Sequence, residues 1–109
     1  VWTRQAVKML NEIKVERGAG GADSFWLHRN VHLTDVNAVL FDAGNGFAGC
    51  IPGINEVLRR QGLVPSNRCL DPEEVLSPGQ AAEIDRISKA YPWLIDDEFV
   101  AENLDRWLS

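Results

Sequence analysis

The sequence predicts a mostly α-helical fold of four to five helices. Apolar residues recur at three- and four-residue spacings in successive stretches, which is the period of a helix with a buried face. Capping and ending signals separate these stretches, and no alternating strand pattern of useful length and no internal repeat is found. With 109 residues, of which 45% are hydrophobic and 25% charged, residues 1–109 have the size and composition of a single helical unit.

A first helix is predicted over residues 5–17. Its apolar side chains follow the helical period, and its lysines fall on another face. The glycine-rich run 18–21 ends this helix, because glycine readily adopts the left-handed backbone that a helix C-terminus needs. The residues expected to be buried are Val7, Leu10 and Ile13.

A second, longer helix is predicted to begin at a cap formed by Asp23 or Ser24 and to run to about Ala43. It is apolar on two sides, which is typical of a helix that lies between two neighbours. One side contains Phe25, Val36, Val39, Leu40 and Ala43, and the other contains Leu27 and Val31.

A third helix is predicted to carry Pro52 in its first turn, where the missing N–H of proline costs nothing. Gly62 suits the left-handed position after the last turn, with Leu63 folding back as its hydrophobic contact. The apolar stripe of this helix consists of Ile54, Val57 and Leu58.

A fourth helix is predicted after a connector, with Ser77 as its cap, Pro78 at its first position and Gln80 closing a capping box. Pro92 stops it, and Asp96 caps a last helix that contains Phe99 and Trp107. The residues that the fourth helix is expected to bury are Ala81, Ile84, Ile87 and Tyr91.

The charge balance excludes several classes of function. Lysine and arginine number 11 against 16 acidic residues, a net charge of -5, so the chain has no basic field that would collect nucleic acid or an anionic membrane. No apolar run has the length of a membrane-spanning helix. The two cysteines are too few for a disulfide framework, which favours a cytoplasmic protein.

Gly44, Gly46 and Gly49 have the spacing of a dinucleotide-binding loop, in which the backbone approaches a pyrophosphate closely. Residues 38–41 would then be the preceding strand, and Asp71 would bind the ribose. Residues 38–41 continue a helical pattern, however, and no other strands are predicted. A glycine-rich loop between helices is therefore the favoured interpretation, and nucleotide binding remains an alternative.

His28 and His32 are four residues apart, which places both on one face of a helix at a metal-ligand spacing. Cys50 and Cys69 could complete a tetrahedral set, but they are not paired in a CxxC motif. His32 faces the apolar stripe, which favours a hydrogen-bonded core histidine. The sequence therefore predicts no metal, no cofactor and no catalytic residue in this chain.

Two segments carry a family resemblance, residues 32–41 (HLTDVNAVLF) and residues 49–63 (GCIPGINEVLRRQGL). They resemble the C-terminal part of the dihydrodipicolinate synthase/N-acetylneuraminate lyase family, which consists of class I aldolases built on a (β/α)8 barrel. The connector at Cys69–Pro72 and the cap at Ser77 and Pro78 are similar to that family too. The resemblance covers about two thirds of the chain.

The resemblance implies that residues 1–45 are late barrel helices and that residues 46–109 are the family's C-terminal helical segment. The parent would be a cytoplasmic, cofactor-free lyase that acts on 2-oxo acids through a lysine imine. Its lysine, its proton-shuttling tyrosine and its Gly-Thr-Thr-Gly-Glu-like loop have no counterpart here, so no catalytic residue carries over and the chain is not expected to be active alone.

The chain also starts at Val1, directly before a helical stretch, which favours a piece of a longer protein. The partner implied is the remainder of the barrel, and the family's use of this segment in subunit contacts also allows a homo-oligomer. The residues expected to pack against the barrel or a partner are Leu40, Ile54, Val57, Leu58, Ile84, Ile87, Trp93, Phe99 and Trp107.

A self-contained helical protein-interaction domain is the alternative from another functional class. In that case Trp93, Phe99 and Trp107 would form the contact surface, because exposed aromatic residues mark interaction sites. Aromatic residues of this kind are more often part of a core. A cooperative thermal transition of the isolated, monomeric chain is the observation that would favour the self-contained domain.

Overall fold

The computed structural model describes residues 1–20 and 24–109. These residues form five α-helices and two short 3-10 helices, and they contain no strand. The predicted mostly α-helical fold is therefore confirmed. In chain order the elements are α1 (Thr3–Gly18), α2 (Phe25–Leu40), η1 (Ala43–Asn45), α3 (Cys50–Arg60), α4 (Gln80–Ala90), η2 (Pro92–Leu94) and α5 (Asp97–Leu108).

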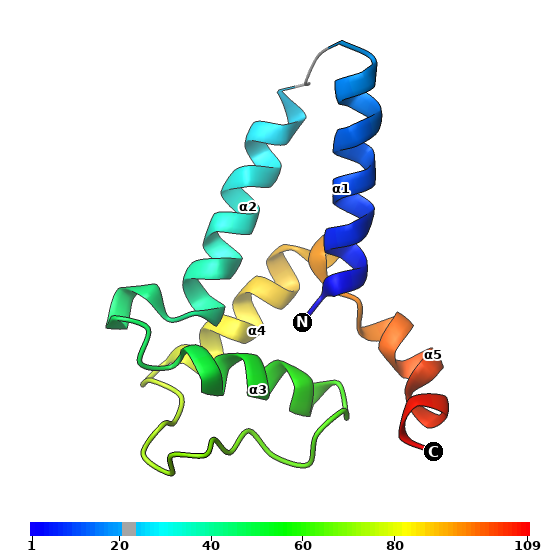
Figure 1. The fold of residues 1–109 in the computed structure, drawn as a ribbon. Coiled ribbons are helices and arrows are strands. Elements are labelled where there is room, and N and C mark those ends of the chain that lie inside the picture. Colours follow the sequence, from blue (N-terminus) through cyan, green and yellow to red (C-terminus); the bar gives the residue numbers. More distant parts are fainter. Residues whose placement is uncertain (21–23) are drawn as a thin grey trace.

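Helices α1 and α2 form an antiparallel hairpin that projects from the rest of the chain (Figure 1). Helices α3 and α4 lie at the base of this hairpin, where both contact the C-terminal part of α2 and also contact each other. The short helix η2 contacts α4 and α1. The chain is thus divided into a projecting hairpin and a base in which three helices meet.

The hydrophobic core lies in this base. Ile84 and Ile87 of α4 are both 0% exposed, and α2 and α3 supply the residues around them. The helix faces that the sequence predicts for α2, α3 and α4 are therefore largely those that pack. The buried members of the core are Trp2, Val36, Leu40, Val57, Ile84, Ile87 and Leu94.

The prediction that α1 buries an apolar face is wrong. No residue of α1 is buried, and Val7 and Leu10 are 52% and 49% exposed. Ile13, the third residue expected to be inside, is exposed as well. The periodicity is present, but no other element in the described part of the chain covers that side of the helix.

Helix α2 is shorter and less enclosed than predicted. It ends at Leu40, because Asp42 adopts a left-handed backbone with φ of 55°, and Ala43 belongs to η1. Its side with Val36 and Leu40 is buried, whereas Leu27 on the other side is 69% exposed. Ser24 occupies the N-cap position, and Asp23 lies outside the described residues.

The ends of the next two helices follow their local sequence signals. Gly62 has φ of 79°, and the Leu63 amide donates to the Leu58 carbonyl at 3.0 Å, which confirms the predicted helix end. Helix α4 ends before Pro92, also as predicted. Ala81, in contrast, is exposed, because the buried side of α4 is centred on Ile84 and Ile87.

Candidate functional site

Asp42 is the centre of a buried polar junction at the foot of α2. Its carboxylate accepts hydrogen bonds from the Gly49 amide at 2.9 Å, the Ser77 hydroxyl at 2.5 Å and the Asn45 side chain at 2.8 Å. The Ser77 hydroxyl has the largest effect, and with the bonds from Asn45 and Gly49 it lowers the pKa of Asp42 against the opposing effect of burial. The charged carboxylate therefore joins α2, the glycine loop and the start of α4.

Gln80 completes the junction. Its amide nitrogen donates to the carbonyls of Gly49 at 3.0 Å and Val39 at 3.2 Å, and its amide oxygen accepts from the Ser77 amide at 3.0 Å. Only this last bond belongs to the predicted capping box. The prediction that Ser77 caps α4 is wrong, because its hydroxyl binds Asp42 and α4 begins three residues later, at Gln80.

The backbone of the glycine loop packs closely against this junction. A Cβ atom at Gly49 would lie 2.0 Å from the Gln80 amide oxygen, and one at Gly53 would lie 2.3 Å from the Leu40 carbonyl oxygen. The segment before the loop is helix α2 and not a strand, and the Gly49 amide is already bound to a carboxylate. This geometry gives no support to a nucleotide site at Gly44, Gly46 and Gly49.

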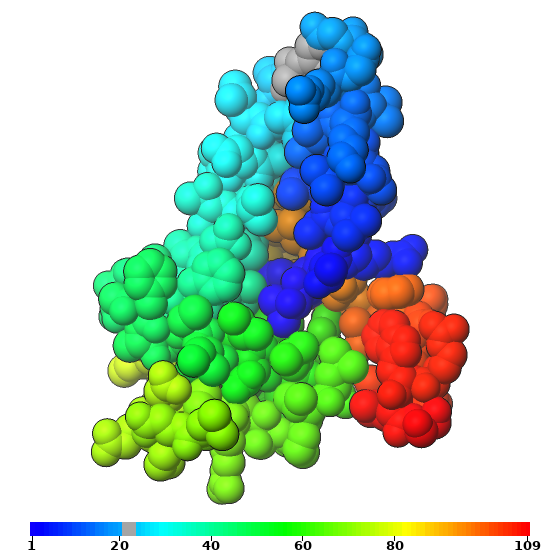
Figure 2. Space-filling view, in the orientation of Figure 1, coloured from blue at the N-terminus to red at the C-terminus, as the bar shows by residue number. Residues whose placement is uncertain are grey.

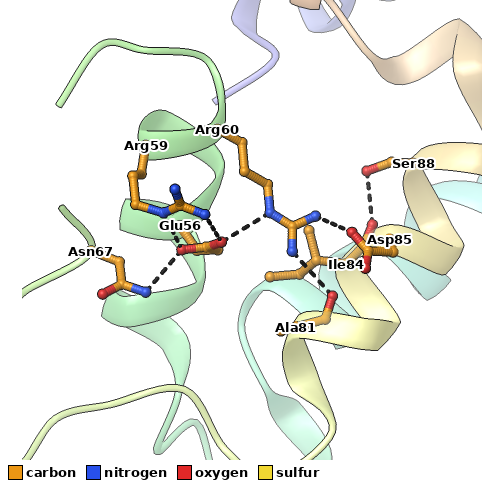
Figure 3. A network of polar contacts seen from close by, with 8 residues as sticks. All are labelled: Glu56, Arg59, Arg60, Asn67, Ala81, Ile84, Asp85 and Ser88. Carbon is orange, nitrogen blue, oxygen red and sulfur yellow. Dashed lines mark hydrogen bonds and ion pairs between the residues drawn. The ribbon is translucent and has the colours of Figure 1, made fainter. Parts of the chain in front are cut away.

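A second buried carboxylate joins α3 to the connector and to α4 (Figure 3). Glu56 accepts hydrogen bonds from Arg59, Arg60 and Asn67, at 2.7 to 3.0 Å. Arg60 also binds Asp85 of α4. The hydrogen bonds from Arg59, followed by those from Arg60 and Asn67, lower the pKa of Glu56 to about 2 although burial raises it.

A third cluster joins α2 to α4 and η2. Asp35 accepts two hydrogen bonds from Arg86, each at 2.8 Å, and one from the Tyr91 hydroxyl at 2.7 Å. These bonds, Arg86 first, lower the pKa of Asp35 to about 2. The ring of Tyr91 stacks on His32 with centroids 4.6 Å apart, and the Nδ1 atom of His32 accepts a hydrogen bond from Trp93 Nε1 at 3.0 Å.

The structure does not assemble a metal site from the residues it describes. Within residues 1–20 and 24–109, no three histidine, cysteine or acidic side chains are arranged to hold an ion. His32 is bound to Trp93, whereas His28 is exposed one turn earlier on α2. Cys50 and Cys69 are half-buried free thiols.

The α1–α2 hairpin has open apolar surface that is available for binding. An open groove of about 710 Å³ runs between its helices, and a hollow of about 820 Å³ adjoins it. Figure 2 shows the hairpin rising above the base of the molecule. The hydrophobic residues exposed along the hairpin are Val7, Leu10, Ile13, Val15, Phe25, Leu27 and Val31.

Two side-chain contacts, one hydrogen bond and one ion pair, hold the hairpin together across this groove. Trp26 Nε1 donates to Glu16, and Arg29 binds Glu12 at 2.6 Å. The Arg29 guanidinium also lies 4.4 Å from the ring centroid of Trp93 in η2. Polar contacts therefore position α1 beside α2 where apolar burial does not, and the cation–π contact joins α2 to η2.

The nine residues predicted to pack against a partner fall into separate places. Leu40, Val57, Ile84 and Ile87 are buried in the core of the chain itself, which leaves their side chains almost no surface for an outside partner. Ile54 and Leu58 are half-buried, as is Trp93, which is bound to His32. Phe99 contacts Trp107 edge to face at 5.6 Å, and Trp107 is 43% exposed.

Sequence reasoning missed the buried carboxylates of Asp42 and Glu56 and the half-buried carboxylate of Asp35. For Glu56 a signal exists, since arginines three and four residues later are placed to pair with it on one helix face. For Asp42 the partner with the largest effect on its pKa gives no local signal, because Ser77 is 35 residues away.

Comparison with known proteins adds no relative: no family model, no curated protein and no solved structure matches the chain. Among the described residues, no helix combines the length and the apolar character needed to cross a membrane. Function is therefore inferred from the arrangement of the chain itself.

Proposed function

We propose that residues 1–109 are a structural, non-catalytic helical segment of a lyase similar to the dihydrodipicolinate synthase/N-acetylneuraminate lyase family. The parent would act on 2-oxo acids through a lysine imine in the cytoplasm. The observation that carries the proposal is the exposed apolar surface of the α1–α2 hairpin, which has no cover in the described part of the chain. Soluble monomers rarely leave an extended apolar surface exposed.

A barrel sheet is a suitable cover for such a surface. In a (β/α)8 barrel the helices form an outer ring and bury one apolar face each on the strands. Helices α1 and α2 have 16 residues each, and so are about 24 Å long at 1.5 Å per residue. That length spans a typical strand of about 17–20 Å.

The base of the molecule also suits a supporting role. The two segments that resemble the family form the C-terminal part of α2 and helix α3 with its glycine end. The Asp42 junction and the close approach of Gly53 to Leu40 hold these elements together. A rigid base of this kind would fix the angle at which the hairpin meets a sheet.

The chemistry of the chain supports a non-catalytic role. An imine-forming lysine needs a desolvated pocket that lowers its pKa. Lys8, Lys14 and Lys89 are all exposed on helices. The Tyr91 hydroxyl is occupied by Asp35, which also raises the pKa of this tyrosine. The proposal therefore assigns the lysine and its proton shuttle to other residues of the parent protein.

The test is to express the complete reading frame that encodes these residues and to treat the product with pyruvate and borohydride. We expect covalent trapping of a reduced imine on a lysine outside residues 1–109, and no trapping on residues 1–109 expressed alone. In the full protein, Leu10→Lys with Ile13→Lys should reduce stability strongly. A reading frame without strand–helix repeats, or a product that traps no imine, would overturn the proposal.

The closed core favours a second candidate, a self-contained interaction domain. Ile84 and Ile87 are completely buried by residues of this chain, so the base has a core of its own. This candidate predicts that residues 1–109 unfold in a single cooperative transition as a monomer, with α1 as stable as α4. The first proposal predicts that α1 exchanges its amide hydrogens far faster than α4.

A further inference from the structure

The α1–α2 hairpin is open on two opposite sides. On α1, the groove of about 710 Å³ is lined by Met9 and Ile13. The hollow of about 820 Å³ is lined by Val7 and Val15. At 3.6 residues per turn, the first pair falls on the side of α1 opposite to the second pair. A single sheet can cover only one of these sides, so the other side needs a separate partner.

The side of α1 that lines the hollow, called the hollow side below, is basic. Arg4 and Lys8 lie on it, and both are exposed. The two carboxylates of α1, on Glu12 and Glu16, are bound to side chains of α2. The charge that α1 offers to a partner on this side is therefore positive, and it borders an apolar surface.

Helix α5 has the opposite charge and lies beside the N-terminal end of α1 (Figure 1). Four of its side chains are acidic and one is basic. Glu98 and Glu102 are exposed, and with Arg4 they line a cleft of about 540 Å³. The Arg4 guanidinium lies 4.1 Å from the ring centroid of Phe99 in α5. The basic side of α1 and the acidic side of α5 therefore meet at Arg4 and form one continuous surface.

The charges on this surface are available for an outside contact. In the described part of the chain, Lys8, Glu98 and Glu102 form no ion pair. The end of α5 offers apolar surface as well, since Trp107 and Leu108 are 43% and 59% exposed. Aromatic side chains of this kind are enriched in the cores of protein interfaces.

We infer that a second copy of this chain docks on the hollow side of α1, so that α5 of each copy lies along α1 of the other. A two-fold axis places a surface against its own copy. Because positive and negative charge occupy adjacent halves of this surface, the axis sets the basic half of each copy against the acidic half of its partner. The dimer therefore contains two identical contacts with opposite charges facing each other.

The dimensions of the two helices suit this contact. Helix α5 has 12 residues and is about 18 Å long at 1.5 Å per residue. The hollow side of α1, from Arg4 to Val15, is about 16 Å long at the same rise. Lys8 then faces Glu98 and Glu102 of the second copy, and the apolar end of α5 covers the hollow.

This inference goes beyond the proposed function and does not rest on the lyase parent. A sheet would cover the side of α1 with Ile13, whereas the second copy covers the side with Val15. Association between copies is measured independently of imine trapping, so either proposal can fail without the other.

The experiment is sedimentation velocity of Lys8→Glu, of Glu102→Lys and of an equal mixture of the two. We expect the unsubstituted protein to dimerise, and each variant alone to dimerise at least about tenfold more weakly, because like charges then face each other in both contacts. The mixture should recover most of the original affinity. In the mixed dimer one contact is unchanged, and the other has its two charges exchanged.

Lys89→Glu and Glu73→Lys are the matched controls. Each makes the same change of charge at an exposed position outside the proposed surface, so both should dimerise as the unsubstituted protein does. A protein that stays monomeric, variants that dimerise as well as these controls, or a mixture that associates no better than its components would each overturn the inference.

The unsubstituted protein gives a second measurement that does not depend on the folding of any variant. Salt screens exposed charges, so the dissociation constant of the dimer should rise as salt increases from about 0.05 M to about 0.5 M. A dissociation constant that stays constant or falls over this range would contradict the pairing of α1 with α5. Dimerisation that is lost in Ile13→Lys and unchanged in Lys8→Glu would place the second copy in the groove and overturn the inference.

Discussion

The hairpin and the base of this protein contain helices with similar apolar periodicity but opposite degrees of burial. In the base, the faces of α2, α3 and α4 meet, and Ile84 and Ile87 are inaccessible to solvent. In the hairpin, Leu10 and Leu27 have the same kind of spacing and remain about half or more exposed. An apolar stripe therefore shows that a helix needs a partner, but not whether the same chain contains it.

The two regions also use polar groups differently. The base buries the carboxylates of Asp42 and Glu56, each with three partners, so charge there fixes how helices meet. The hairpin relies on the contacts of Glu12 and Glu16 with α2, at the border of an open groove. These hairpin contacts are part-buried and link one pair of side chains each, whereas each buried carboxylate of the base binds three partners.

The largest expected effect tests the difference in burial. Ile84→Ala should lower the free energy of unfolding by about 3–4 kcal/mol, because it leaves a cavity in the core. Leu10→Ala, its hairpin counterpart, should change it by less than about 0.5 kcal/mol. Urea denaturation of both variants measures the difference, and equal losses would show that α1 is as well packed as α4.

A smaller effect should come from the close approach at the corner of α2 and α3. Gly53→Ala places a Cβ atom 2.3 Å from the backbone oxygen of Leu40, and this neighbour cannot turn away as a side chain could. We expect a loss of about 2 kcal/mol, because overpacking exceeds the gain in helix propensity. Gly44→Ala is the control, since a Cβ atom at Gly44 would meet no neighbouring atom within 4 Å, and it should be nearly neutral.

The smallest of the three effects concerns acid and the Glu56 cluster. The folded pKa of Glu56, about 2, lies below its ordinary value of 4.5, so its contribution is complete above pH 4.5 and is lost as the pH falls toward 2. That contribution should be about 1–2 kcal/mol. Denaturation of Glu56→Gln from pH 6 to pH 2.5 should show a flatter pH dependence.

Glu83→Gln is the comparison for this acid titration. Glu83 binds Arg86 at the exposed surface of α4, so its loss should leave the pH dependence nearly as in the unsubstituted chain. A pH dependence that is identical in Glu56→Gln and the unsubstituted chain would show that the base does not depend on this buried charge.

The sequence predicts the parts of this fold that depend on neighbouring residues. Gly62 ends α3 and Pro92 stops α4 because each acts through its own backbone geometry, which distant residues hardly change. The apolar faces of α2 and α4 are also predicted, because the residues that form each face lie within one helix.

The failures involve residues far apart in the chain. Ser77 does not cap α4, because Asp42 competes for its hydroxyl from 35 residues away. The burial predicted for Val7 and Leu10 fails because periodicity describes one helix and carries no information about its neighbours. The exposed hairpin, which is the candidate site, could therefore be recognised only once the neighbours of α1 were known.

The carboxylate of Asp42 has a consequence for glycine-rich loops in general. In a nucleotide-binding loop the bound phosphate orders the backbone amides, so the order of the loop depends on the concentration of that ligand. Here the counter-charge is covalently part of the chain, so its local concentration is permanent and dilution cannot remove it. Such a loop has a structural role. A glycine spacing of this kind that follows a buried aspartate therefore predicts a structural loop and not a nucleotide-binding site.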